Sequence, residues 1–97
     1  MSSPTEYDLC FHPKALKEWK NLTKSVQERL LKKLAERLQQ PHIETSRLRG
    51  ALNRYKIKIG TPAFRLVYEV EGRQLKVLAI AKKGDKDSPY QKANERS

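Results

Sequence analysis

The hydrophobic periodicity of this chain changes near its middle from about four residues to two. Apolar residues recur every three or four positions over 26–38, which predicts a helix with one apolar face. Over 54–59 and 64–70 apolar residues instead alternate with polar ones, which predicts two strands joined by a tight turn. The more continuous apolar segment 75–81 predicts a third strand in a central position. Helices followed by strands indicate the α+β class.

The N-terminal part contains a further strand and a further helix. Residues 7–11 alternate and predict a short strand, while leucines and a tryptophan at helical spacing predict a helix over 13–21. Thr23 and Ser25 are candidate caps for the helix that follows, and Ser25 begins a capping-box pattern. The predicted order is β-α-α-β-β-β, with one short helical turn around Tyr90 near the C-terminus.

Length and composition narrow the class of protein. A chain of 97 residues suffices for one domain, residues 1–97, with a small antiparallel sheet of about four strands and the helical hairpin on one face. The longest apolar run is 77–81, so no membrane span is expected, and no secretory signal is visible. One cysteine, Cys10, and two histidines are too few for a disulfide or a metal site. We therefore expect a cytoplasmic protein without metal or cofactor.

The charge balance indicates a polyanionic partner. Lysine and arginine number 21 against 11 acids, a net charge of +10, which suits nucleic acid, an acidic membrane or an acidic protein. Between residues 45 and 68 the chain carries no acid and six cations, which are Arg47, Arg49, Arg54, Lys56, Lys58 and Arg65.

Strand register gathers three of these cations. The apolar faces of the two predicted strands coincide if Ile57 lies opposite Leu66, and Lys58 then lies directly opposite Arg65. Lys56 is two residues along the same face, which points away from the helices. Like charges at such positions cost up to about 1 kcal/mol. The cluster is either a solvated strand face or an anion site prepared for a phosphate, and the density of charge favours the anion site.

A second group of cations lies on the outer face of the predicted helix at 26–38. Arg29, Lys32, Lys33 and Arg37 are partly offset by glutamates. The simpler interpretation is a solvated helix face. The alternative is a surface that lies along a phosphate backbone.

Cleavage of bound RNA without a metal would need a base for the 2′-hydroxyl and an acid for the leaving 5′-oxygen. His12 and His42 are not placed near the cluster by the predicted elements, so lysine and tyrosine are the remaining candidates. Lysine is largely protonated at neutral pH and is a weak base there. Such an enzyme would act slowly on free RNA and would need a partner that orients the substrate.

The same residues resemble those of RelE toxins from type II toxin-antitoxin systems. The resemblance covers about residues 7–90 and is carried by the segments Leu48-Arg49-Gly50, Tyr55-Lys56-Ile57-Lys58 and Arg65-Leu66-Val67-Tyr68, by 15–19 and by Tyr90. It implies a ribosome-dependent mRNA endonuclease that enters the A site of the 30S subunit, contacts rRNA and mRNA, cuts the codon and inhibits translation. The products would be a 2′,3′-cyclic phosphate and a 5′-hydroxyl.

Residue roles also follow from this resemblance. It implies Lys56 as the general base, Lys58 as a cation on the phosphate and Arg65 as the residue that stabilises the transition state. It further implies that Arg49 holds the RNA and that Tyr90 stacks on or orients an mRNA base. The other cations that we expect to contact RNA are Arg47, Arg54, Lys83, Lys86, Lys32 and Lys33.

One position departs from the family pattern. An ungapped alignment to Tyr90 places Gly84 where the family usually has an arginine on the leaving-group side. Lys83 and Lys86 are the nearest substitutes, but lysine lacks the guanidinium fork, so the general acid is unassigned. The resemblance also implies an acidic, RelB-like antitoxin as a partner.

Two other functions fit the same fold. A ParE-like toxin directed at DNA gyrase would not need Lys56, Lys58, Arg65 and Tyr90 together. A non-catalytic domain that binds nucleic acid would lose affinity about equally on losing any one cation.

Overall fold

The computed structural model describes residues 7–48, 50, 53–82, 84 and 88–96. Its elements, in chain order, are β1 (Asp8–Phe11), α1 (Pro13–Lys20), α2 (Lys24–Gln39), the 3-10 helix η1 (Glu44–Ser46), β2 (Arg54–Ile59), β3 (Phe64–Glu71), β4 (Gln74–Lys82) and α3 (Pro89–Arg96). The predicted order β-α-α-β-β-β is confirmed. The expected short turn near Tyr90 is instead a helix of eight residues, about two turns.

The four strands form one mixed sheet in the order β1-β4-β3-β2. β2, β3 and β4 are antiparallel neighbours, whereas β1 pairs with β4 in parallel, so the expectation of a wholly antiparallel sheet was wrong at this strand. The reason is topological, because β1 and β4 are joined by a long connection that contains α1, α2, β2 and β3, and parallel neighbours need such a crossover in place of a tight turn. β4 lies inside the sheet, as its apolar sequence predicted.

The register between β2 and β3 is the predicted one. Ile57 pairs with Leu66, and Lys58 pairs with Arg65. Because side chains alternate along a strand, this register sends the apolar residues of both strands to one face and the cations to the other.

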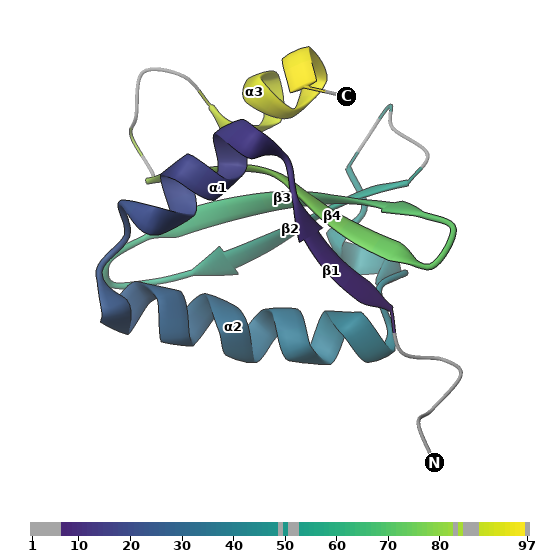
Figure 1. Cartoon of the computed structure of the whole chain (residues 1–97), viewed down its shortest axis with the longest axis horizontal. Coiled ribbons are helices and arrows are strands. Elements are labelled where there is room, and N and C mark those ends of the chain that lie inside the picture. The colour runs from purple at the N-terminus through teal and green to yellow at the C-terminus, as the bar shows by residue number, and fades with distance from the viewer. Residues whose placement is uncertain (1–6, 49, 51–52, 83, 85–87, 97) are drawn as a thin grey trace.

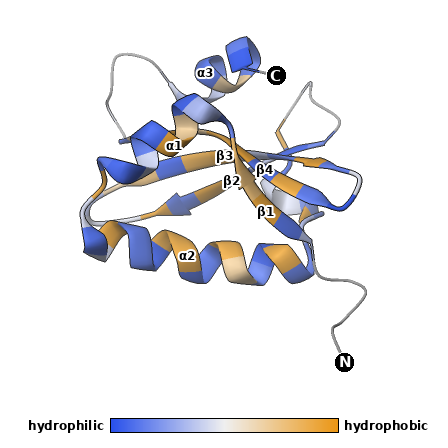
Figure 2. Ribbon diagram, viewed as in Figure 1, coloured by the Kyte–Doolittle hydropathy of each residue, from blue (hydrophilic) through white to orange (hydrophobic). Residues whose placement is uncertain are grey.

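The first face of the sheet is covered by α2 (Figure 1), and Ala15 of α1 belongs to the same core cluster. Leu30 and Leu34 of α2 are fully buried and belong to one cluster with Tyr55, Leu66 and other strand residues. Figure 2 shows the alternation of apolar and polar residues along α2 that this packing requires. The cap of α2 is Thr23, whose hydroxyl accepts a hydrogen bond from the Val26 N–H at 3.4 Å.

The second face is partly covered by α3, which lies on the opposite side of the sheet from α2 (Figure 1). A register shift lets Val67 pair with Ala79 while Tyr68 pairs with Val77, so Leu78 is an extra residue in β4. Leu78 and Ala79 then pack with Ala93 of α3 in a second cluster. Helix α3 thus covers part of the face opposite α2, because Leu78 and Ala79 of β4 both present apolar side chains to it.

None of the helices in the described part of the chain is long and apolar enough to cross a membrane.

Candidate nucleic-acid site

A cavity of about 550 Å³ opens on the second face of the sheet. Its lining comes from β2, β3, α3 and the segment before β2, and consists of Leu48, Gly50, Arg54, Lys56, Lys58, Arg65, Tyr90 and Asn94. The structure therefore brings together Lys56, Lys58, Arg65 and Tyr90, the four residues that the sequence analysis joined. Half of the described lining residues are cations and none is an acid, which makes the cavity attractive to a phosphate.

The strands hold the three cations firmly in place. Tyr55 and Ile57 are buried on the first face, so the alternating residues Lys56 and Lys58 must point to the second. Arg65 is held opposite Lys58 by the ladder between β2 and β3. A site built on paired strands is more rigid than one built on a loop.

Arg54 is engaged inside the protein, although the sequence suggested an RNA contact. Its Nε donates to the Glu69 carboxylate at 3.1 Å, and its Nη1 donates to Asn94 Oδ1 at 2.7 Å. Arg54 thus ties β2 to β3 and α3 at the wall of the cavity, and Glu69 offsets its charge.

Of the remaining expected RNA contacts, those that the structure describes are outside the described lining of this cavity. Arg47 is bound to Glu44 at 3.2 Å and is not among the described residues that line the cavity. Arg49, Lys83 and Lys86 lie outside the described residues. Lys32 and Lys33 are exposed on α2 and line a different cavity.

Two arginines of the outer face of α2 have structural roles instead. Arg29 donates hydrogen bonds to the carbonyl oxygens of Gly60 and Thr61, which holds the turn between β2 and β3 against α2. Arg37 donates to the Lys56 carbonyl at 3.2 Å and to the Tyr68 hydroxyl at 2.9 Å. These two guanidiniums were predicted to lie on a solvated or phosphate-facing surface, and periodicity alone did not reveal their partners.

Tyr68 is the centre of a buried polar contact beneath β2. Its hydroxyl donates to the Pro41 carbonyl at 2.7 Å and accepts from Arg37. Burial raises the pKa of Tyr68, and the adjacent Arg37 only partly opposes this effect.

The two histidines have local structural roles, in agreement with the sequence analysis. His12 Nδ1 accepts the Lys14 N–H at 3.1 Å and caps α1, while His42 Nδ1 is hydrogen-bonded to the Tyr55 hydroxyl at 2.8 Å. Burial lowers the pKa of His12, and the nearby cations Arg96, Lys76 and Lys14 lower it further. A neutral imidazole is the form that can accept the capping hydrogen bond.

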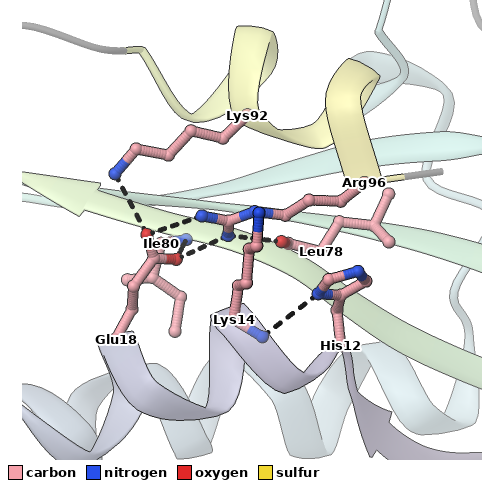
Figure 3. A network of polar contacts seen from close by, with 7 residues as sticks. All are labelled: His12, Lys14, Glu18, Leu78, Ile80, Lys92 and Arg96. Atoms are coloured by element: carbon pink, nitrogen blue, oxygen red, sulfur yellow. Dashed lines mark hydrogen bonds and ion pairs between the residues drawn. The ribbon is translucent and has the colours of Figure 1, made fainter.

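α3 is fixed beside the cavity by a cluster of polar contacts around Glu18 of α1 (Figure 3). Arg96 donates to both Glu18 oxygens at 2.8 and 3.1 Å, and Lys92 donates to one of them at 3.0 Å. The Ile80 N–H donates to Glu18 at 3.0 Å, and Arg96 donates to the Leu78 carbonyl at 2.8 Å. The cluster supplies hydrogen-bond partners to backbone groups of β4 beyond the end of β1, and it holds the helix that carries Tyr90.

The carboxylate at the centre of this cluster is stabilised in its charged form. Burial alone would raise the pKa of Glu18, but hydrogen bonds from Arg96, the Ile80 N–H and Lys92 outweigh burial and lower it. No local pattern in the sequence reveals this role of Glu18, because its partners in α3 follow it by 74 and 78 positions.

Gly84, in the position where an arginine was expected, has a φ of +96°. L-residues rarely adopt this conformation, so the local backbone suits glycine. Position 84 therefore contributes no side chain.

Comparison with known proteins shows which class of protein has this sequence. Residues 9–86 match the sequence model of the ParE toxin family of type II toxin-antitoxin systems. The fold and the match define a type II toxin.

Individual relatives identify the family within this class of toxins. The chain is 42% identical over 91 residues to the mRNA interferase toxin RelE of Escherichia coli K12, which covers 93% of this chain and 96% of the relative. An mRNA interferase RelE of Shigella flexneri matches equally. The chain therefore belongs to the RelE family.

Solved structures match in the same way. A mutant of the E. coli toxin RelE with two arginines replaced by alanine, in the free state, superposes with a TM-score of 0.84 at 40% identity, over 94% of this chain and 97% of that chain. The toxin in the intact E. coli RelBE toxin-antitoxin complex superposes with a TM-score of 0.77 at 42% identity, over 81% and 99%.

Proposed function

We propose that this protein is the toxin of a toxin-antitoxin pair and inhibits translation as an mRNA endonuclease that acts on the ribosome. The relatives named mRNA interferase support the activity, since they align over nearly the whole chain. The observation that carries the proposal is the cavity that joins Lys56, Lys58 and Arg65 with Tyr90 and has no acid among its described lining residues.

Each of these side chains has a role in the proposed cleavage. Lys56 accepts the proton of the 2′-hydroxyl as its oxygen forms a bond to phosphorus. The bond to the 5′-oxygen breaks, and that oxygen takes up a proton from water, since no side chain is assigned as the general acid. Lys58 and Arg65 stabilise the charge that develops on the phosphoryl oxygens. Tyr90 stacks on a base and fixes the nucleotide, as aromatic side chains do with single strands. The products are a 2′,3′-cyclic phosphate and a 5′-hydroxyl.

The proposed reaction depends on the ribosome because the protein supplies charge but little alignment. A well-aligned nucleophile can be worth an effective concentration of about 10⁵–10⁸ M. A codon held in the A site of the 30S subunit, among rRNA and mRNA, provides this alignment for a weak lysine base. Action there places the protein in the cytoplasm.

An acidic, RelB-like antitoxin is the proposed partner in the inactive state. A relative of this chain is part of the intact E. coli RelBE toxin-antitoxin complex, and the net charge of +10 suits an acidic partner. Such a partner would neutralise the cavity before mRNA reaches it.

The test is codon cleavage on a programmed ribosome by purified variants, mapped by primer extension. We expect Lys56→Ala and Arg65→Ala each to reduce cleavage at least about 100-fold, the usual loss for one group that stabilises a transition state. Both should keep the circular dichroism of the wild type. Lys24→Ala, an exposed lysine in the first turn of α2, is the control for charge and should cut normally.

Two further results would contradict the proposal. Normal cutting by both cavity variants would show that the site is misplaced. Efficient cleavage of naked RNA, where we expect almost none, would refute the dependence on positioning.

A gyrase-directed toxin is the second candidate, because the matching family model is that of ParE. This function gives no role to the cation cavity. Inhibition of supercoiling by purified gyrase, retained in Arg65→Ala, would favour it. A non-catalytic nucleic-acid-binding domain would bind ribosomes without cutting mRNA.

A further inference from the structure

A second basic cavity of about 470 Å³ lies between α2 and the end of β2. Its described lining consists of Arg29, Lys32, Lys33, Glu36, Lys58, Ile59 and Gly60. Lys58 lines this cavity and also the first one. β2 is an edge strand, so a ligand can pass from one face of the sheet to the other around it. The two cavities therefore adjoin at Lys58, beside the outer edge of β2.

The second cavity combines fixed and adjustable positive charge. Arg29 is held by the carbonyl oxygens of Gly60 and Thr61, and it keeps its charge in that position. Lys32 and Lys33 are exposed and carry compact, strongly hydrated charges on flexible stems. Four cations and one acid line this cavity in the described chain.

The lining indicates which part of a ligand would be bound. It contains no aromatic side chain on which a base could stack, and Ile59 is its one apolar side chain among the described lining residues. Bases bind single-strand sites chiefly by stacking, whereas lysine and arginine contact phosphates without regard to sequence. An acidic protein segment would also need apolar anchors, because charge alone gives little affinity at an interface. The backbone of a nucleic acid fits this lining better than either a base or a peptide.

We propose that the second cavity binds backbone phosphates of the same RNA strand whose reacting phosphate occupies the first cavity. The strand would pass Lys58, turn around the edge of β2 and follow Lys32 and Lys33 along α2. This inference rests on the proposed function for its choice of ligand. It adds a binding segment outside the reacting nucleotides, which would hold the strand without reading its sequence.

Binding of two oligonucleotides of different length tests the proposal. The probes are a trinucleotide and a dodecanucleotide with 2′-O-methyl groups, which block attack by the 2′-oxygen, and binding is followed by fluorescence anisotropy over a series of salt concentrations. The test variant is Lys32→Ala/Lys33→Ala. The matched control is Lys20→Ala/Lys24→Ala, which removes two exposed lysines that are outside the described lining of both cavities.

The expected result is a loss that depends on probe length. For the dodecanucleotide, loss of two phosphate contacts should reduce the slope of log affinity against log salt by about 1.4, or about 25-fold in affinity at 0.1 M salt. The trinucleotide should bind the test variant and the wild type alike, and the control pair should change neither probe by more than about 2-fold.

Three results would overturn the proposal. Unchanged dodecanucleotide binding in the test variant would show that the strand does not reach α2. An equal loss in the control pair would show a general effect of net charge. Weaker ribosome binding by the test variant with normal oligonucleotide binding would assign the lysines to ribosomal RNA. Because no arm of this experiment measures cleavage, its outcome is independent of whether the proposed endonuclease activity is found.

Discussion

Replacing Glu18 with glutamine tests whether a carboxylate in α1 positions the helix that completes the cavity. Glutamine has nearly the same shape, and its side-chain oxygen can still accept the Ile80 N–H. The substitution removes the negative charge that faces Arg96 and Lys92. Any effect on α3 then comes from these two ion pairs and not from a cavity in the packing.

The magnitude follows from the burial of the partners. Hydrogen bonds to charged groups contribute about 1.5–3 kcal/mol when buried, whereas exposed ion pairs contribute less than about 1 kcal/mol. The side chains of Glu18, Arg96 and Lys92 are 21, 10 and 22% exposed, which lies nearer the buried limit. Glutamine keeps an oxygen that can still accept a hydrogen bond, so we expect a loss of about 2 kcal/mol for the two pairs together, which raises the equilibrium constant for local opening of α3 about 30-fold.

Amide hydrogen exchange measures this opening directly. The protection of α3 amides should fall about 30-fold in Glu18→Gln, while that of β3 and β4 away from α3 should change much less. Codon cleavage should fall less than in Arg65→Ala, because α3 remains mostly docked. The control for charge is Glu95→Gln, which removes an exposed acid of α3 itself. Unchanged α3 protection in Glu18→Gln would refute the positioning role.

Two more outcomes are expected from groups with shifted pKa values. Because the pKa of Glu18 is lowered in the folded protein, the wild type should be more stable than Glu18→Gln above the ordinary glutamate pKa. This difference in unfolding free energy should vanish as the pH falls through the folded value of the pKa. A constant difference from pH 7 to about 3 would contradict the assignment. Tyr68→Phe leaves the Pro41 carbonyl and the Arg37 guanidinium without their hydroxyl partner and should cost about 1–3 kcal/mol in urea denaturation, whereas Tyr90→Phe, at the cavity, should cost less than about 0.5 kcal/mol; equal losses would count against the buried polar contact.

The part of the fold that sequence predicted best is the ladder between β2 and β3. Alternation of apolar and polar residues leaves few acceptable registers, and a tight turn selects one of them. Lys58 therefore lies opposite Arg65 as expected, and Lys56 falls on the same face. The core of the candidate site follows from this local rule.

Contacts between distant segments were not predictable in the same way. The polar sequence of α3 gives only a weak helical signal, and its docking depends on an extra residue in β4 that no turn motif announces. Periodicity places Arg37 and Arg54 on surfaces, but it does not say which acid, hydroxyl or carbonyl will meet each guanidinium. Both arginines bind partners within the protein that only the tertiary structure reveals.

The core and the proposed site of this protein depend on one register. In β2 the buried residues Tyr55 and Ile57 alternate with Lys56 and Lys58, so each core contact fixes the direction of a neighbouring cation. A slip of one residue would expose the apolar side chains and drive the amines toward α2. The slipped state would lose the burial of Ile57 and would bury the lysine charges, and these two effects together destabilise it by several kcal/mol. The hydrophobic core thereby excludes the arrangements in which the cations would be dispersed, so the cation cavity proposed as the phosphate site forms when the protein folds.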